Sequence, residues 1–330
     1  MIRFRSSLLF LFCLLPFHVA HAQNVDIEEI SESADEESNG VSFGEAKTTH
    51  WKVGVIVTAS RGPVKGVLCT IPEPSEWPEQ SVKLISKKVT PGVRFKHRDL
   101  RGVKQLVVSI PKLGNGKRAE ALFTYEVSRK TILGPKETEE FVVPKKAPRD
   151  TKRWLNSSPY IDTRDSKIKS LAKEKFRSLE GEGAWKQVEG LYELVRELVE
   201  YKEGKIKTAS KALRDGEGDC EELTSLFIAM CRVNRVPARM VWIPDHCYPE
   251  FYLEDAKGKG HWMPCQAAGT RAFGEMPEMR PILQKGDNFK VPEKSKPQRY
   301  VAEFMTGKPA QRGAGPPDHK FVRELVQPGV

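Results

Sequence analysis

The sequence predicts an α+β protein with an N-terminal antiparallel β-sandwich and a C-terminal domain in which helices pack on an antiparallel sheet. Two changes in residue periodicity lead to this prediction. Apolar and polar residues alternate between Trp51 and Arg129, which is typical of strands with one buried face. From residue 165 apolar residues recur every three or four positions, as in amphipathic helices, and strand-like segments return after Pro237. A chain of 330 residues is long enough to bury both cores.

Residues 1–22 have the features of a secretory signal peptide. Arg3 and Arg5 give a basic start, Leu8 to Phe17 is apolar, and Ala20-His21-Ala22 fits the small-x-small cleavage pattern. A helix needs roughly 20 apolar residues to span a bilayer. The apolar run near the N-terminus has about half that length, and no later apolar segment comes close to it. We therefore expect a secreted or periplasmic protein without a transmembrane segment; an uncleaved anchor is the alternative.

Residues 23–49 are predicted to form a disordered acidic leader. Seven acids and no bases lie between Asp26 and Glu37, and such segments rarely fold alone. The rest of the chain is then more basic than the formal net charge of +10 indicates. This basic surface is compatible with an anionic envelope polymer as partner, or simply with a solvated lysine-rich face. No nucleic-acid motif accompanies it, so a nucleic-acid partner is not expected.

The predicted sandwich covers residues 50–132. Its strands are expected in "WKVGVIVTA", "VKGVLCTI", "VKLISKKV", "VRFKHR", "VKQLVVSI" and "RAEALFTYEVSR", which are rich in β-branched and aromatic residues and separated by Gly/Pro turns. Residues 133–153 mix charge with prolines and are predicted to be a linker. The second domain is expected at 154–305, opening with the amphipathic segments "DSKIKSLAKEKF" and "AWKQVEGLYELVRELVEY". Residues 306–330 are expected to form a C-terminal tail.

Five cysteines follow the predicted signal peptide, and the sequence assigns them different roles. They form no C-x-x-C pair and no tight Cys/His cluster, so neither a metal site nor a cofactor is expected. The odd number means that at least one thiol is free or pairs with another chain. Cys69 and Cys231 lie in apolar patterns and are expected to be buried thiols.

Cys220 has the position of a nucleophile. It follows Asp219, which is able to cap a helix with Glu222 at the third helical position. A cysteine in the first turn faces unpaired N–H groups and the positive end of the helix dipole, which favour a thiolate. Glu221 and its acidic neighbours oppose this effect unless they point away, so a histidine partner is needed.

A family resemblance supplies that partner. Gly218-Asp219-Cys220 opens an apolar helix that ends in Val-Pro-Ala-Arg; His246 begins a strand as His-x-aromatic-x-Glu, and Trp262 lies on the next strand. This order and spacing, over residues 154–270, resembles the transglutaminase-like (papain-like thiol) superfamily. The resemblance implies Cys220 as nucleophile, His246 as general base and a third residue, usually Asp, four positions after the tryptophan.

Gln266 stands at this third position. Trp262, Pro264 and Gln266 share a strand face, as do His246 and Tyr248. With His246 opposite Gln266, the amide oxygen is expected to accept the Nδ1–H and fix the tautomer, as the neutral Asn of papain-like proteases does. A neutral acceptor stabilises an imidazolium less than a carboxylate does, which affects turnover and pH optimum.

The same register places Cys247 opposite Cys265 on the other face of the hairpin. Two buried thiols or a cross-strand disulfide both fit this arrangement, and the strain of adjacent-strand bridges favours the thiols.

The expected function is that of a thiol enzyme. Cys220, His246 and Gln266 would act on a peptide bond or a glutamine amide of a protein or peptide substrate through a thioester. Hydrolysis by a protease or amidase and transamidation to an amine both remain open. The alternatives are a binding module with a decayed site, which Gln266 motivates, and an envelope structural protein that uses the basic surface.

Overall fold

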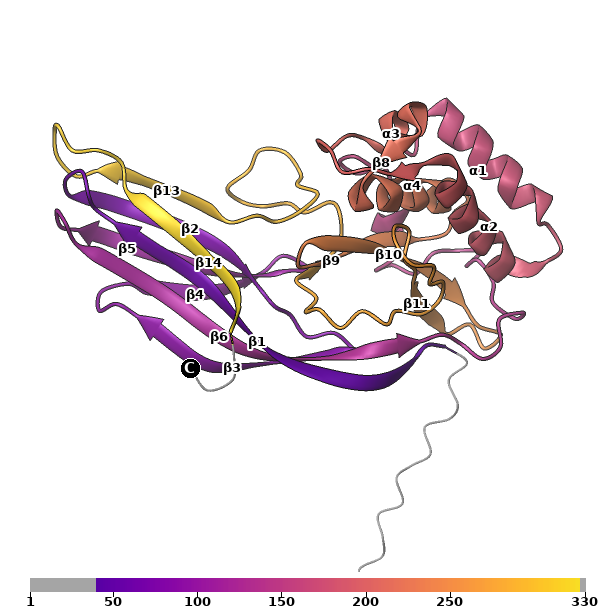
Figure 1. Ribbon diagram of the computed structural model, residues 1–330, viewed down its shortest axis with the longest axis horizontal. Coiled ribbons are helices and arrows are strands. Elements are labelled where there is room, and N and C mark those ends of the chain that lie inside the picture. Colours follow the sequence, from indigo (N-terminus) through magenta and orange to yellow (C-terminus); the bar gives the residue numbers. More distant parts are fainter. Residues whose placement is uncertain (1–39, 327–330) are drawn as a thin grey trace, which may run out of the picture. The chain divides into compact units, whose positions relative to one another are not determined.

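The computed structural model describes residues 40–326, and its β-sandwich has more strands than predicted (Figure 1). Two four-stranded sheets, with orders β14-β1-β6-β3 and β13-β2-β5-β4, form it, and the pairs are antiparallel. The strands are β1 (Ser42–Thr58), β2 (Val64–Glu73), β3 (Gln80–Val89), β4 (Arg94–Asp99), β5 (Lys104–Leu113), β6 (Arg118–Leu133), β13 (Phe304–Pro309) and β14 (Asp318–Val326).

The sandwich core follows the alternation seen in the sequence. Trp51, Val53, Val55 and Val57 of β1 are buried at every second position and meet inward-facing residues of the second sheet. Cys69 lies in this core with no exposed surface, as expected for a buried thiol. The six predicted strands form in the predicted order; the alternation of buried residues is clear in β1, whereas β3 is exposed along most of its length.

The predicted leader and tail boundaries are wrong where the structure describes them. Strand β1 begins at Ser42, inside the expected leader of residues 23–49, because β6 supplies hydrogen-bond partners to a polar segment that buries little. Strands β13 and β14 occupy most of the expected tail of residues 306–330, and β14 pairs with β1 from His50 to Thr58. The predicted signal peptide, residues 1–22, lies outside the described residues.

Residues 134–151, within the predicted linker, contain no helix or strand but are packed. Phe141 is buried, and Val142 forms a β-bridge with Glu254. The 3₁₀ helix η1 (Lys152–Leu155) then leads into the helical part.

The second part of the fold packs helices on a small antiparallel sheet (Figure 1). Helix α4 (Cys220–Val233) is buried along most of its length and packs on β9 and β10. The remaining elements are α1 (Ser166–Ser178), α2 (Gly183–Leu198), α3 (Ala209–Asp215), β7 (Glu200–Tyr201), β8 (Glu217–Gly218), β9 (Ala238–Ile243), β10 (His246–Glu254), β11 (Gly260–Pro264) and β12 (Gln284–Lys285). The sheet order is β11-β10-β9-β12. This α+β arrangement is the predicted fold class.

Buried charges join the small sheet to the sandwich. The ammonium of Lys285 lies 2.5 Å from carboxylate oxygens of both Glu79 and Glu250, and Arg239 pairs with Glu250 at 2.8 Å. Arg129 donates to the Tyr248 hydroxyl at 3.2 Å. Removing one member of such a network leaves a buried charge unpaired, so it fixes the contact between the two sheets. No helix within residues 40–326 is long and apolar enough to cross a membrane.

Candidate active site

The local sequence builds the start of α4 as predicted. Gly216 ends α3 with a φ of 72°, a conformation that glycine adopts without strain. Asp219 then caps α4: its carboxylate accepts from the Glu221 N–H at 2.7 Å, and Glu222 accepts from the Asp219 N–H at 2.8 Å. This capping box fixes Cys220 as the first residue of α4, next to N–H groups that have no acceptor within the helix.

The acids around Cys220 are engaged elsewhere. Glu222 also accepts from the Lys207 N–H at 2.8 Å, and Glu221 pairs with the Arg299 guanidinium. Burial raises the pKa of Glu221 to about 7 in spite of Arg299. The carboxylates that oppose a thiolate are therefore either bound to backbone N–H groups or ionised less readily than usual.

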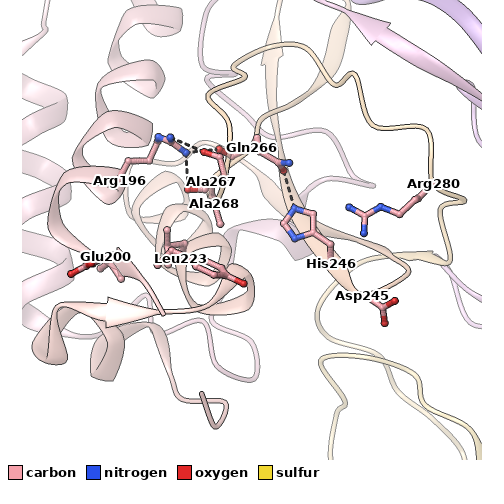
Figure 2. Close-up of a pocket in the computed structure, with 12 residues that line it drawn as sticks. Arg196, Glu200, Leu223, Asp245, His246, Gln266, Ala267, Ala268 and Arg280 are labelled. Atoms are coloured by element: carbon pink, nitrogen blue, oxygen red, sulfur yellow. Dashed lines mark hydrogen bonds between the residues drawn. The ribbon is translucent and has the colours of Figure 1, made fainter. Parts of the chain in front are cut away.

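The side chain of His246 contacts that of Gln266. The two atoms are His246 Nε2 and Gln266 Oε1, 3.0 Å apart, and Figure 2 shows the amide aimed at the ring. Because Oε1 accepts only, Nε2 carries the hydrogen. The predicted partnership is present, but the expectation that Nδ1–H makes this bond is wrong.

The strand register explains the difference. The observed β10–β11 pairing sets Glu250 against Pro264 and Tyr252 against Trp262. Gln266 lies two residues beyond the end of β11, where its backbone N–H bonds to Ala272, so it is not directly opposite His246. The side chain reaches the ring diagonally and meets Nε2.

Hydrogen bonds favour the ionised form of Cys220. The side chain of Cys247 makes the largest contribution, burial opposes it, and the His246 side chain and charge and the Cys247 backbone N–H add to it. Together they lower the pKa of Cys220 to about 5. Burial lowers the pKa of His246, but its bonds to Cys220 and Gln266 and the thiolate charge raise it overall. These opposite shifts favour a thiolate–imidazolium pair at neutral pH.

The predicted Cys247–Cys265 pairing is wrong. Cys247 lies across from Trp242 on β9 and contacts Cys220, whereas the Cys265 N–H bonds to the Pro249 carbonyl at 3.0 Å. The hairpin turn at Asp255–Lys259 sets a register two residues away from the expected one. All five cysteines of residues 40–326 are free thiols. Cys247 and Cys265 are therefore buried thiols without a disulfide, as favoured, but they do not lie opposite each other; Cys231 is buried as predicted.

Two residues of the site carried no clear signal in the sequence. Cys247 becomes part of it only through the contact of β10 with α4. Arg196, near the end of α2, donates to the carbonyls of Gln266, Ala267 and Gly269 at 3.2, 3.3 and 2.9 Å (Figure 2). It holds the turn that carries Gln266. A single arginine beside an apolar stripe does not reveal such a contact.

Two hollows flank His246. One, of about 620 Å³, lies beside Gln266 and is lined by Arg196, Tyr201 and Arg280 among others; Figure 2 shows its residues. The other, of about 490 Å³, is lined by Cys220, Trp242, Arg299 and Tyr300 among others. An extended chain therefore has space on both sides of the Cys220–His246 pair. Within residues 40–326 no group of three or more His, Cys, Asp or Glu side chains has the arrangement of a metal site.

A family model and one solved structure agree with this fold. Residues 169–267 match the sequence model of the Transglutaminase-like superfamily, a span that contains Cys220, His246 and Gln266. The structure resembles that of a proposed cysteine protease from Cytophaga hutchinsonii with a TM-score of 0.53 and 16% identity, over 88% of this chain and 94% of the other. A proposed protease from Parabacteroides distasonis matches with a TM-score of 0.27 and 12% identity, over 73% of this chain and 49% of the other. No curated protein matches.

The structure shares its α+β fold with the Cytophaga hutchinsonii protein, and residues 169–267 resemble the transglutaminase-like superfamily. The chain contains a transglutaminase-like domain. The similarity to the Cytophaga hutchinsonii protein extends over the β-sandwich as well, so the combination of the two parts is shared by both structures.

Proposed function

We propose that this protein is an exported cysteine peptidase or amidase whose nucleophile is Cys220. The observation that carries the proposal is the meeting of Cys220, at the start of α4, with a histidine whose Nε2–H is held by Gln266 at 3.0 Å. The thiol contacts the imidazole and the imidazole contacts the amide oxygen, which is the order of contacts in papain-like sites.

The proposed reaction has two stages. The Cys220 thiolate attacks an amide carbonyl, and the His246 imidazolium gives its proton to the leaving amine, which produces a thioester. His246 then takes a proton from water, which attacks the thioester and releases the acid. The Cys220 backbone N–H is the oxyanion donor that the helix start offers. Replacement of water by an amine in the second stage would give transamidation.

Gln266 sets a limit on this chemistry. Its neutral amide oxygen orients the imidazole but adds less stabilisation to the imidazolium than a carboxylate would. The raised pKa of His246 instead depends chiefly on the nearby thiolate. We therefore propose a site that works while Cys220 and His246 are both charged.

Peptide-resolved alkylation tests the proposal. Iodoacetamide labelling from pH 4 to 9 is expected to show Cys220 reacting well below pH 7, and His246→Ala is expected to remove this reactivity. A digest of a proteome-derived peptide mixture, analysed by mass spectrometry, should then yield products with the wild type and none with Cys220→Ala. Products with new free amino termini indicate hydrolysis, whereas products in which two peptides are joined indicate transamidation.

The opposite result defines the competing function. The enzyme proposal would be overturned if Cys220 is labelled slowly, with the pH dependence of an ordinary thiol, and no product is formed. A folded Cys220→Ala protein that retains its cellular role would then support a non-catalytic binding module.

Export and a polymer partner are further parts of the proposal. Residues 1–22 support export, and sequencing of the mature N-terminus is expected to find Gln23. Strand β3 presents exposed Lys83, Lys87 and Lys88, which support binding to an anionic envelope polymer. The amount of protein that co-sediments with envelope material should fall as the salt concentration rises. Binding that does not change with salt concentration would contradict the proposed polymer partner.

A further inference from the structure

The hollow on the side of Cys220 away from Gln266 has walls from distant parts of the chain. Trp242 comes from β9, Arg299 and Tyr300 precede β13, Trp51 lies on β1 and Arg323 on β14. Only Trp242 and Cys220 among these lie within the span of residues 169–267 that matches the family. The wall facing them belongs to segments outside that span.

The β1–β14 pairing brings two sandwich residues to this wall. Arg323 pairs with Val53, two residues from Trp51, so Trp51 and Arg323 are diagonal neighbours on one sheet face. The Arg323 side chain is 47% exposed, and its guanidinium reaches the Tyr300 hydroxyl at 3.3 Å. The sandwich thus contributes a positively charged side chain to the hollow that Cys220 also lines.

Aromatic rings hold the second cation in place. The rings of Trp242 and Tyr300 meet edge to face with centroids 5.0 Å apart, and the Arg299 guanidinium lies 5.3 Å from the Trp242 ring centroid. A guanidinium fixed on an aromatic face keeps its N–H fork available for a carboxylate.

The acids near the two guanidinium groups leave room for another anion. Arg323 has Glu303 at 3.4 Å, and Arg299 has Glu221. Burial raises the pKa of Glu221 to about 7, so the carboxyl beside Arg299 ionises less readily than an ordinary glutamate. Asp219 is already bound to the N–H groups of α4. The ion pairs and the tyrosine contact of the two guanidinium groups involve Nη1 of each, so a carboxylate that enters the hollow meets further N–H groups of both arginines.

We propose that this hollow is a substrate subsite for an acidic side chain beside the scissile amide, and that the β-sandwich, through Trp51 and Arg323, forms part of it. The inference rests on the proposed function, because it assumes that Cys220 is the attacking atom. It adds the substrate class, an extended peptide with Glu or Asp next to the cleaved bond. It also gives the sandwich a place in substrate recognition.

The test uses covalent labelling rather than turnover. Two iodoacetylated dipeptide probes that differ only in Glu against its isostere Gln are reacted with the full-length mature protein at pH 7, and Cys220 modification is followed by mass spectrometry. A charge-assisted hydrogen bond of about 1.5 kcal/mol predicts that the Glu probe reacts about 10-fold faster. Raising the salt concentration should reduce the ratio.

Variants assign the preference to the proposed residues. Arg323→Gln is expected to reduce the ratio to about 3-fold, and Arg299→Gln combined with Arg323→Gln to bring it to about 1. Arg312→Gln, an exposed arginine between β13 and β14, is the matched control and should leave the ratio unchanged. Thermal unfolding checks that each variant is folded.

The outcomes separate the two proposals. Rapid, His246-dependent labelling of Cys220 without preference for the Glu probe would overturn the subsite and leave the thiol-enzyme proposal intact. The same preference in wild type and in the double variant would also overturn it. If neither probe modifies Cys220 in a His246-dependent way, both proposals fail.

Discussion

The buried side chain of Cys247 hydrogen-bonds to Cys220, one residue along β10 from the histidine that the nucleophile also meets. Burial raises the pKa of Cys247 well above its usual value, so it stays a thiol and donates its S–H. The backbone N–H of the same residue adds a second donor to the Cys220 sulfur. One residue thus supplies both a side-chain and a backbone hydrogen bond to the proposed nucleophile.

Replacement of Cys247 by Ala is expected to raise the pKa of Cys220. The thiolate loses its largest side-chain donor, and a hydrogen bond to a charged group is worth about 1.5 kcal/mol or more. The pKa should rise from about 5 to about 6, so iodoacetamide labelling of Cys220 at pH 5.5 should slow about 4-fold, while labelling at pH 9 changes little. Cys265→Ala, which removes another buried thiol, is the control. Unchanged labelling in Cys247→Ala would show that the backbone donor and His246 suffice.

Substitution of Gln266 should move the alkaline limit of activity. Gln266 raises the pKa of His246 through its hydrogen bond, so Gln266→Ala lowers that pKa and the imidazolium is lost at lower pH. We expect kcat to fall about 10-fold and the alkaline limb of the kcat/KM profile to shift downward. Gln266→Glu adds a negative charge and should shift the same limb upward. An alkaline limb that stays fixed in both variants would contradict the assignment.

Arg196 is expected to act through Gln266. Arg196→Ala removes donors to three carbonyls of the turn that carries the amide, and we expect kcat to fall about 10-fold with little change in KM. The losses in Arg196→Ala and Gln266→Ala should not add in the double variant, because both disturb the same contact. Arg271→Ala, which removes an exposed arginine paired with Glu189 and Glu193, is the control. Fully additive losses would refute this role.

Glu221 should make stability depend on pH. Burial raises its pKa to about 7 from a usual value of 4.5, so folding takes up a proton between these values. Stability contributed by the protonated form is therefore present below about pH 4.5 and lost as pH rises through 7. Glu221→Gln is expected to raise the free energy of unfolding at pH 8 by about 1–2 kcal/mol and to leave it unchanged at pH 4. Urea unfolding at both pH values measures this, and equal effects at the two values would contradict the prediction.

The elements that depend on local pattern could be predicted from the sequence. The capping box at Asp219 and Glu222, the apolar stripe of α4 and the alternation of β1 each involve neighbouring residues, and all are present. The meeting of Cys220, His246 and Gln266 was predicted because the family resemblance supplied a long-range constraint.

Contacts between distant segments could not be predicted in the same way. A hairpin register that differs by two positions moves every cross-strand pair, which is why Cys247 does not lie opposite Cys265. Its contact with Cys220 instead comes from the packing of β10 on α4. The polar residues from Ser42 to Thr49 become a strand only because β6 pairs with them. The proposed role of Arg323 depends on the β1–β14 pairing, for which a Gly/Pro-rich C-terminal segment gives no periodic signal.

The β1–β14 pairing has a consequence for how the chain folds. The sandwich is built from residues 42–133 and 304–326, so the transglutaminase-like domain is an insertion between its strands. Residues about 270 positions apart must meet before the sheet is complete, and contacts of such high sequence separation form slowly. Among the described strands β14 leaves the ribosome last, so the edge of β1 that pairs with it stays unpaired until then. Premature termination after residue 309 would remove β14, leaving that edge open to aggregation and the proposed acidic-residue subsite without Arg323.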